Sequence, residues 1–309
     1  MYFPYFRGRQ FELIALRELL DLKVMHEKIV PIIEPVKLSS TLTKTLAMFL
    51  NEHREIAVIH NPQVGSFKLE VAKESSLKEI YISQLENTLI IKSHLINRKS
   101  ETEILELNTF GVMPQDLLTL TLDVDNLEYF ERLFDNSCGR LNIIPDERQL
   151  KRSVTNNKVL IEDSFIKQTK NSDYKDKPDE FFSDNHLYFN EEGYVGFSDY
   201  SVVGNIYSES GFAPYAVAIH IVYFDTKKNL RIMHFVSDSN DDIQDPGGKF
   251  YEAVRKLYVW SEENTIRTYG LNELVKHYRN QTYPGLGTVK KLSIMHHMEL
   301  MSQYFRGEI

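Results

Sequence analysis

The chain has 309 residues, enough for one large α/β domain or two smaller ones, and its formal net charge is −8. An apolar content of 42% supports a packed core and argues against a disordered protein, and the acidic balance argues against a general nucleic-acid coat. The single cysteine, Cys138, excludes a disulfide within the chain and fits a reducing compartment. The sequence opens without a signal peptide and has no uncharged run of the ~18–20 residues that span a membrane, so we expect a cytoplasmic protein with no membrane partner.

Residues 1–37 predict a strand, a helix and a second strand. Tyr2–Phe6 is an aromatic run that ends at a turn containing Gly8. Apolar residues recur at helical spacing over Gln10–Leu22. Ile29–Ile33 is a continuous apolar run, as expected of a strand that is buried on both faces. Such a βαβ unit implies parallel strands covered by helices.

The same alternation continues to Asp163. We expect seven strands, centred near residues 4, 32, 58, 90, 120, 143 and 160, with a mean step of roughly 26 residues. This period is typical of a TIM-like (βα)8 barrel, and a doubly wound open sheet is the alternative. We favour the barrel because no glycine-rich phosphate turn follows the first strand and because every strand ends in polar residues. Six strand positions should then be buried: Ile32, Val58, Ile90, Leu120, Ile143 and Leu160.

Helices are expected between these strands. Ser39 and Ser40 can cap a helix over Leu42–His53. A single amphipathic helix is expected within Leu69–Glu86, and another helix over Leu127–Phe134.

The βα period is lost after Asp163. Residues 167–192 are polar and charged, and they predict a long loop with one short helix. Tyr194–Phe197 is the expected eighth strand, and a β-hairpin follows over Ala216–Val236. Three helices are expected at the end of the chain: Phe250–Trp260, Leu271–Arg279 and Val289–Phe305.

This pattern divides the chain into a barrel core over residues 1–201 and a hairpin-and-helix extension over residues 202–309, which together can form one structural unit. We expect the extension to pack on the core and to serve recognition. The hairpin is too apolar to stand alone, and we expect it to pack on the barrel or on the last helix. Its packing should involve the following side chains: Tyr215, Tyr223 and Phe235 from the hairpin, and Leu292, Met295, Met298 and Tyr304 from the last helix.

Four segments carry a family resemblance. The opening YFPYFRGRQFELIALREL, the following PIIEPV, and the later HNPQVG and GFSDYS resemble the phage-type "beta protein" family. The resemblance covers about the first two hundred residues. It implies a setting of phage conflict or antiviral defence, with a partner protein encoded nearby. It implies no particular reaction.

Functional sites of barrels form at the carboxyl ends of the strands. We expect catalytic roles for five residues at these ends: Glu34, His60, Asp123, Glu162 and Asp199. We expect substrate contacts from five more: Arg7, Arg9, Lys37, Asn61 and Lys92. The remaining polar residues at strand ends are His94, Asp125, Asp146, Asp163 and Tyr200. Arginine and lysine bind phosphate, and carboxylates bind hard cations. The set therefore favours an anionic substrate such as a nucleotide or nucleic acid, with or without a divalent cation such as Mg²⁺.

A structural role is the alternative for each of these residues. Glu34 can pair with Arg7 or Arg9 and fix the end of the barrel. Asp123 can cap the following helix. A histidine just past an apolar strand, such as His60, is often a hydrogen-bonded structural residue.

Two other patterns do not predict a site. His296 and His297 are neighbours in a helix, so they point to different faces and cannot chelate a metal as an i,i+4 pair would. Arg7-Gly8 at the first strand resembles the opening of barrel phosphodiesterases of the glycerophosphodiester type. That family begins with His-Arg-Gly, however, and Phe6 stands in place of its histidine.

Two hypotheses follow. The first is a barrel enzyme that acts on a phosphorylated or otherwise anionic substrate. The second is a non-catalytic binding or sensor subunit that recognises a partner protein or a phage component. Convergence of Glu34, Asp123, Glu162 and Asp199 on one point would favour the enzyme. Separate neutralisation of each carboxylate would favour the binding protein.

Overall fold

The computed structural model describes residues 1–134, 139–209 and 214–309, and Cys138 lies outside these ranges. The chain divides into two compact units, which are described separately below. Unit 1 consists of Met1–Leu13, Glu27–Asp163 and Asn185–Tyr200. Unit 2 consists of Ile14–His26, Ser164–Asp184 and Ser201–Ile309. Whether the chain can be separated at residue 201, as the sequence suggests, stays a prediction.

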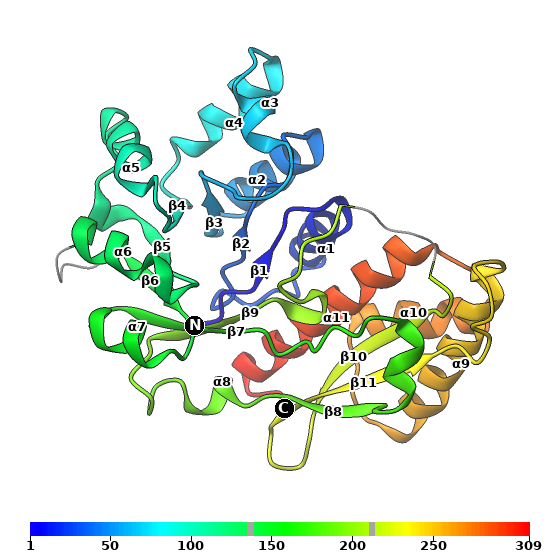
Figure 1. Cartoon of the computed structure of the whole chain (residues 1–309). Helices are drawn as coiled ribbons and strands as arrows, with labels where there is room; N and C mark the ends of the chain where they lie inside the picture. The colour runs from blue at the N-terminus through cyan, green and yellow to red at the C-terminus, as the bar shows by residue number, and fades with distance from the viewer. Residues whose placement is uncertain (135–138, 210–213) are drawn as a thin grey trace. The chain divides into compact units, whose positions relative to one another are not determined.

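Eight parallel strands form a nearly closed barrel in unit 1 (Figure 1). In sheet order they are β1 (Tyr5–Phe6), β2 (Ile32–Ile33), β3 (Ile56–Ile59), β4 (Ile90–Leu95), β5 (Leu118–Leu120), β6 (Leu141–Ile144), β7 (Lys158–Glu162) and β9 (Gly196–Asp199). The ring closes at Tyr2, which bridges Ile29 on one side and Phe197 on the other. The predicted TIM-like barrel is therefore confirmed, and the open-sheet alternative is not.

Helices alternate with these strands. They are α1 (Gln10–Asp21), α2 (Ser40–Asn51), α3 (Phe67–Val71), α4 (Ser76–Leu85), α5 (Ser100–Thr109), η1 (Pro114–Asp116), η2 (Val124–Asn126), α6 (Leu127–Phe134), α7 (Arg148–Ser153) and α8 (Asn185–Tyr188). The boundary between the two units runs through α1, after Leu13. Helix α2 starts as expected, because the Ser39 hydroxyl accepts a hydrogen bond from the amide of Leu42 at 3.2 Å.

The single helix predicted within Leu69–Glu86 is wrong in one respect. Two helices, α3 and α4, occupy this region, and α3 already begins at Phe67. The second helix has its own start, since the Ser75 hydroxyl caps the amide of Lys78 at 3.2 Å. Apolar periodicity alone predicts one continuous helix here, because it does not detect a serine cap inside the segment.

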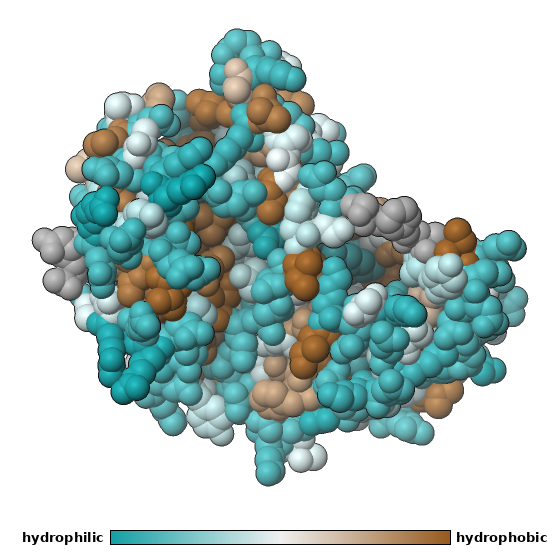
Figure 2. Space-filling view, in the orientation of Figure 1, coloured by the Kyte–Doolittle hydropathy of each residue, from teal (hydrophilic) through white to brown (hydrophobic). Residues whose placement is uncertain are grey.

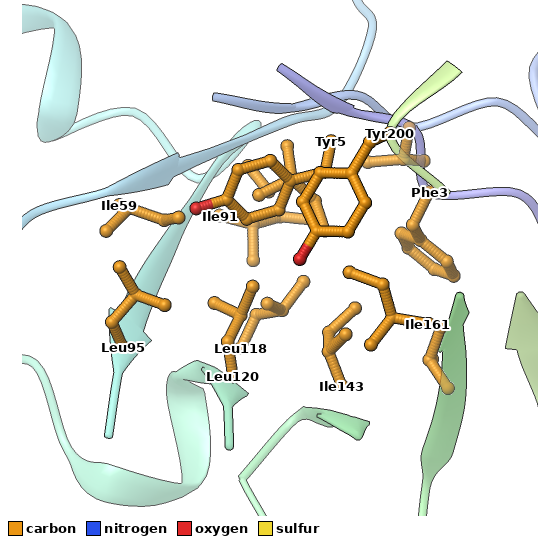
Figure 3. Close-up of a cluster of buried hydrophobic side chains, with 14 residues drawn as sticks. Phe3, Tyr5, Ile59, Ile91, Leu95, Leu118, Leu120, Ile143, Ile161 and Tyr200 are labelled. Carbon is orange, nitrogen blue, oxygen red and sulfur yellow. The ribbon is translucent and has the colours of Figure 1, made fainter. Parts of the chain in front are cut away.

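The interior of the barrel is filled by side chains, as Figure 3 shows. Side chains alternate along each strand, so that Phe3 and Tyr5 of the first strand segment point inward. The buried cluster comprises Phe3, Tyr5, Val30, Ile32, Ala57, Ile59, Ile91, Leu95, Leu118, Leu120, Ile143, Val159, Ile161 and Tyr200. All six strand positions predicted to be buried are at most 3% exposed.

Unit 2 contains a three-stranded antiparallel sheet in the order β10–β11–β8. Its strands are β8 (Asp179–Ser183), β10 (Ala218–Phe224) and β11 (Leu230–Val236). Its remaining elements are η3 (Asn171–Lys175), η4 (Ser201–Val203), α9 (Pro246–Glu263), α10 (Tyr269–Arg279) and α11 (Leu286–Arg306). The predicted hairpin and the three terminal helices are confirmed. None of the helices in the described ranges is long and apolar enough to cross a membrane.

The loop predicted over residues 167–192 is wrong where β8 adds a third strand to the hairpin. Strand β8 is five residues long and begins with two acidic residues, so its sequence lacks the apolar alternation of a typical strand. Its place is fixed by its partner: Arg231 of β11 forms an ion pair with Asp179 at 3.0 Å, and Phe182 is 2% exposed.

The hairpin packs within unit 2 only partly as expected. Tyr223 and Phe235, expected against the barrel or the last helix, both contact the ring of Trp260 on α9, with centroid distances of 5.5 and 5.7 Å. Leu292, Met295 and Met298 of α11 are buried. Tyr304 is half-buried and packs on Phe224. The expectation for Tyr215 is wrong, because this side chain is 59% exposed.

Candidate functional site

The carboxyl end of the barrel carries a buried ion pair between Arg7 and Glu34. The Glu34 side chain is fully buried and accepts hydrogen bonds from the Tyr5 hydroxyl at 2.6 Å and from the backbone amide of Gln63 at 2.7 Å. The guanidinium of Arg7 forms the ion pair with the same carboxylate and lies over the ring of Tyr5. The pairing of Glu34 with Arg7, the structural role expected for it, is therefore confirmed, and its catalytic role stays a prediction.

Two tyrosines lie beside this ion pair. The rings of Tyr5 and Tyr200 are 5.0 Å apart, and their hydroxyl groups project among the inward side chains in Figure 3. Burial raises the pKa of Tyr200 to about 12, against the opposing charge of Arg7 and with a smaller contribution from Asp163. Both phenols are therefore neutral at physiological pH. The centre of this end of the barrel is occupied by protein side chains.

A second polar cluster lies at the carboxyl ends of β3 and β4. His60 Nε2 and His94 Nδ1 are 2.6 Å apart, and the two rings are stacked. His94 is fully buried, and its Nε2 lies 2.7 Å from the Ser100 hydroxyl. The three side chains form one continuous hydrogen-bonded chain.

Asn61 and Glu103 hold this chain in place. The Asn61 side chain bonds both the amide and the carbonyl of Leu95, and also donates to Glu103 at 2.7 Å. Glu103 in turn accepts from Asn97 and lies 3.4 Å from the ammonium of Lys68. These contacts of the Asn61 amide position the cluster, and its predicted role in substrate binding stays a prediction.

Burial determines the protonation of these groups. It lowers the pKa of His60 to about 4, although the charge of Glu103 opposes this effect. It lowers the pKa of His94 to about 2, with further contributions from His60 and Lys68. Burial also raises the pKa of Glu103, but hydrogen bonds from Asn97 and Asn61 and the charge of Lys68 outweigh it and leave a net lowering. At neutral pH the site therefore contains two neutral imidazoles beside a carboxylate.

The cluster borders a pocket of about 440 Å³. This volume lies within the range of about 300–1,000 Å³ that is usual for small-molecule sites. Its lining combines polar and apolar side chains: His60, Asn61, Phe67, Lys68, Val71, Ala72, Lys78, Glu103, Glu106, Leu107 and Phe110. Phe110 is 83% exposed at the rim. Apolar surface is also exposed over α4 and α5 (Figure 2). Ile80 of α4 and Leu105 of α5 are 47% and 59% exposed.

The other predicted catalytic carboxylates do not join either cluster. Asp123 is exposed and caps η2 by accepting from the amide of Asp125, which is the structural alternative. Glu162 and Asp199 are register partners on β7 and β9, and they share the outward face, opposite to Ile161. Asp199 accepts from Tyr2 at 2.8 Å, and Glu162 accepts from Asn185 at 2.8 Å.

The predicted substrate contacts are similarly dispersed. Lys37 is exposed. The ammonium of Lys92 donates to the carbonyl of Asn87 at 3.1 Å, and burial lowers its pKa. The backbone amide of Arg9 donates to Glu12 in the first turn of α1. Of the predicted set, the structure therefore brings together Arg7 with Glu34, His60 with Asn61 and, on the outward face, Glu162 with Asp199.

The positions of the predicted carboxylates do not suit the expected magnesium ion. Hard cations require several oxygen ligands around one point. Glu34 is held by Arg7, Asp123 caps a helix, and the Glu162–Asp199 pair lies on the outward face. Among the described residues, no group of three or more His, Cys, Asp or Glu side chains has a geometry that would hold a metal. The predicted carboxylates do not fit such an ion.

Sequence reasoning did not single out Lys68, Ser100 or Glu103. The Ser100–Glu103 spacing is that of a capping box, which places both residues in the first turn of a helix. That signal predicts where α5 starts, but it does not indicate that the first turn faces His94. Lys68 was not found because α3 was not expected as a separate helix.

Comparisons with family models, with curated proteins and with solved structures find no match for this chain. We therefore infer a function from the residues of the two clusters alone.

Proposed function

We propose that the barrel is a binding module whose ligand site is the pocket beside His60. The observation that carries this proposal is that the four predicted carboxylates do not meet at one point. Glu34 pairs with Arg7 and Asp123 caps a helix. Asp199 and Glu162 accept hydrogen bonds on the outward face. An imidazole with a pKa near 4 is also a weak general base at neutral pH. It is well suited to recognise a ligand as a neutral hydrogen-bonding group.

The lining of the pocket favours a small phosphorylated ligand. Lys68 and Lys78 supply two positive charges, which are paired with Glu103 at 3.4 Å and with Glu74 at 2.6 Å, and lysine binds phosphate as a point charge. Phe67 and Phe110 offer ring surface for an apolar or planar part of the ligand. Glu103 and Glu106 make the pocket selective, because they disfavour a ligand with several negative charges. A nucleoside monophosphate combines these features.

This proposal predicts that Lys68→Met weakens the binding of adenosine or uridine monophosphate by about tenfold, as expected for the loss of one charge contact worth about 1.4 kcal/mol. Lys73→Met is the matched control, because Lys73 is exposed two residues beyond α3 and does not line the pocket. Isothermal titration of the three proteins gives the comparison. Equal affinities of wild type and Lys68→Met would contradict the proposal.

The His60–His94–Ser100 chain favours a second candidate, acid–base catalysis. In such a chain His60 can take up a proton from the pocket and become an imidazolium, His94 can share that charge across the nitrogen–nitrogen contact, and the Ser100 hydroxyl can hold the tautomer of His94. If the chain is catalytic, the wild-type protein should hydrolyse a monophosphate and release phosphate, and the His60→Gln variant should not. Release that is unchanged in His60→Gln would exclude the chain as its source, and binding without release would leave the binding module as the function.

The biological setting follows from the resemblance to the phage-type beta protein family. We propose that the binding module works in phage conflict or antiviral defence, together with a partner protein encoded nearby. Purification of the tagged protein from its own host tests this proposal. The product of a neighbouring gene should co-purify with the tagged protein in a fixed ratio. If no such product co-purifies from either uninfected or infected cells, the result would argue against a partner.

A further inference from the structure

Two histidines face each other in the antiparallel sheet of unit 2. His220 of β10 and His234 of β11 are register partners, so their side chains lie on the same face of the hairpin. Their Nδ1 atoms are 2.7 Å apart. Burial lowers the pKa of His220 well below its usual range, and the neighbouring His234 adds to this. Burial likewise lowers the pKa of His234, although Glu180 opposes it.

The position of Glu180 defines the tautomers of this pair. Only one hydrogen atom fits between two ring nitrogens that are 2.7 Å apart. The carboxylate of Glu180, on β8, lies 3.4 Å from His234 Nε2 without the geometry of a hydrogen bond, and its negative charge favours a hydrogen on that atom. His234 then accepts at Nδ1, and His220 donates from its own Nδ1. The Nε2 atom of His220 is left as a hydrogen-bond acceptor.

His220 lines a pocket of about 240 Å³ in unit 2. The rings of Phe165 and Tyr174 pack edge-on against it, with centroid distances of 4.9 and 4.7 Å. Lys167 and Lys290 supply positive charge to the same lining. The volume is slightly below the usual range of about 300–1,000 Å³, which fits a ligand of about one ring.

We propose that this pocket is a second ligand site, for a small planar heterocycle that carries a ring N–H and an acidic group. His220 accepts the N–H, Glu180 orients His220 through His234, and Lys167 binds the acidic group. Aromatic side chains fix the plane of the ring. The site is independent of the pocket beside His60, since it contains none of the same residues.

The orientation by Glu180 can be tested without any ligand. Long-range ¹H–¹⁵N NMR of the imidazole rings should show the Nδ1–H tautomer on His220 and the Nε2–H tautomer on His234. In Glu180→Leu, which removes the carboxylate, His220 should shift toward the Nε2–H tautomer. A wild-type His220 in the Nε2–H form, or a tautomer that does not change in Glu180→Leu, would overturn this part of the proposal.

Ligand binding is tested with orotate, a pyrimidine that carries ring N–H groups and a carboxylate. Orotate should shift the His220 imidazole signals, and benzoate, which lacks the N–H, should bind about tenfold more weakly. Lys167→Met should weaken orotate binding by a similar factor. The control is Lys170→Met, because Lys170 is exposed in the same loop and does not line the pocket. Equal binding by both variants, or no shift with millimolar orotate, would overturn the proposal. Lys68→Met should leave the orotate-induced shift of the His220 imidazole signals unchanged, which separates this test from that of the barrel pocket.

Discussion

Glu34 shows how a single buried charge constrains the barrel. Its carboxylate has no solvent exposure, and its ionised form depends on Arg7, Tyr5 and the amide of Gln63. Breaking a buried ion pair by removing one partner leaves an uncompensated charge, at a cost of about 3–5 kcal/mol. Removing both partners is much less costly, since no charge remains without a counterion.

We therefore predict that Arg7→Met destabilises the protein by about 3 kcal/mol, and that adding Glu34→Gln recovers much of this loss. Urea unfolding midpoints of the single and double variants provide the measurement. Arg9→Met is the matched control in the same turn and should change stability by less than about 1 kcal/mol. A double variant that is less stable than Arg7→Met alone would refute this account of the pair.

His94 should make stability depend on pH in a defined window. Its pKa falls from 6.5 to about 2 on folding because the ring is buried. Between these two pH values His94 is therefore protonated in the unfolded chain and neutral in the folded protein. The stability due to neutral His94 is complete above pH 6.5 and is lost as the pH falls from 6.5 toward 2, by up to about 1.4 kcal/mol per pH unit. Neutral His60 also contributes stability that is lost as the pH falls, and this loss is complete near pH 4.

The variant His94→Asn should thus lose stability less steeply than the wild type between about pH 6.5 and 4, whatever its stability at neutral pH. Unfolding midpoints at several pH values measure the slope. His53→Asn is the control, because His53 is exposed and should give the wild-type slope. An unchanged slope in His94→Asn would show that this ring is protonated in the folded state.

Residue types at strand ends were predictable from the sequence, but the directions of their side chains were only partly so. Glu34 follows the inward Ile32 and therefore faces the interior, whereas Asp199 alternates with the inward Tyr200 and faces outward. The sequence does not show where a strand starts in register with its neighbours. Strand β9 begins at Gly196, two residues later than predicted, and such shifts decide which carboxylates can meet.

At the scale of elements, long apolar strands and helices were the easiest to predict. The strands from β2 to β7 each contain buried apolar residues and recur at a regular spacing, so their burial made them predictable without knowledge of their partners. Strand β8 is held by pairing with β11, and its own sequence is acidic at its start. An element whose stability comes from its partner is not visible in its own composition.

Gly270 permits a close approach between α10 and α11. A Cβ at this position would collide with the carbonyl of Leu292 and would lie 2.7 Å from the amide of His296. Neither backbone atom can move without shifting α11. We predict that Gly270→Ala lowers stability by about 1–3 kcal/mol, although alanine favours helix.

Gly247→Ala is the matched control in the first turn of α9. A Cβ there meets nothing closer than 3.7 Å, so the substitution should be neutral or stabilise by up to about 1 kcal/mol. Thermal or urea unfolding of the two variants gives the comparison. If Gly270→Ala were as stable as Gly247→Ala, the two helices would not be in the close contact described here.

At the scale of the whole molecule, the chain combines a barrel with a second unit assembled from three separate segments. The loss of βα period after Asp163 predicted that a different architecture begins there. The sequence did not indicate that Ile14–His26 belongs to the second unit. Helix α1 reads as one continuous amphipathic segment, and periodicity carries no information about which partner each end contacts.

The central claim is that the pocket beside His60 is the ligand site of the barrel. A crystallographic fragment screen of the whole protein tests it most directly, because it makes no assumption about the identity of the ligand. We predict that phosphate-bearing and carboxylate-bearing ring fragments collect in this pocket, with their acidic groups near Lys68 and their rings against Phe110. A pocket that stays empty across the screen, while the same fragments bind beside Arg7 and Tyr200, would contradict the claim.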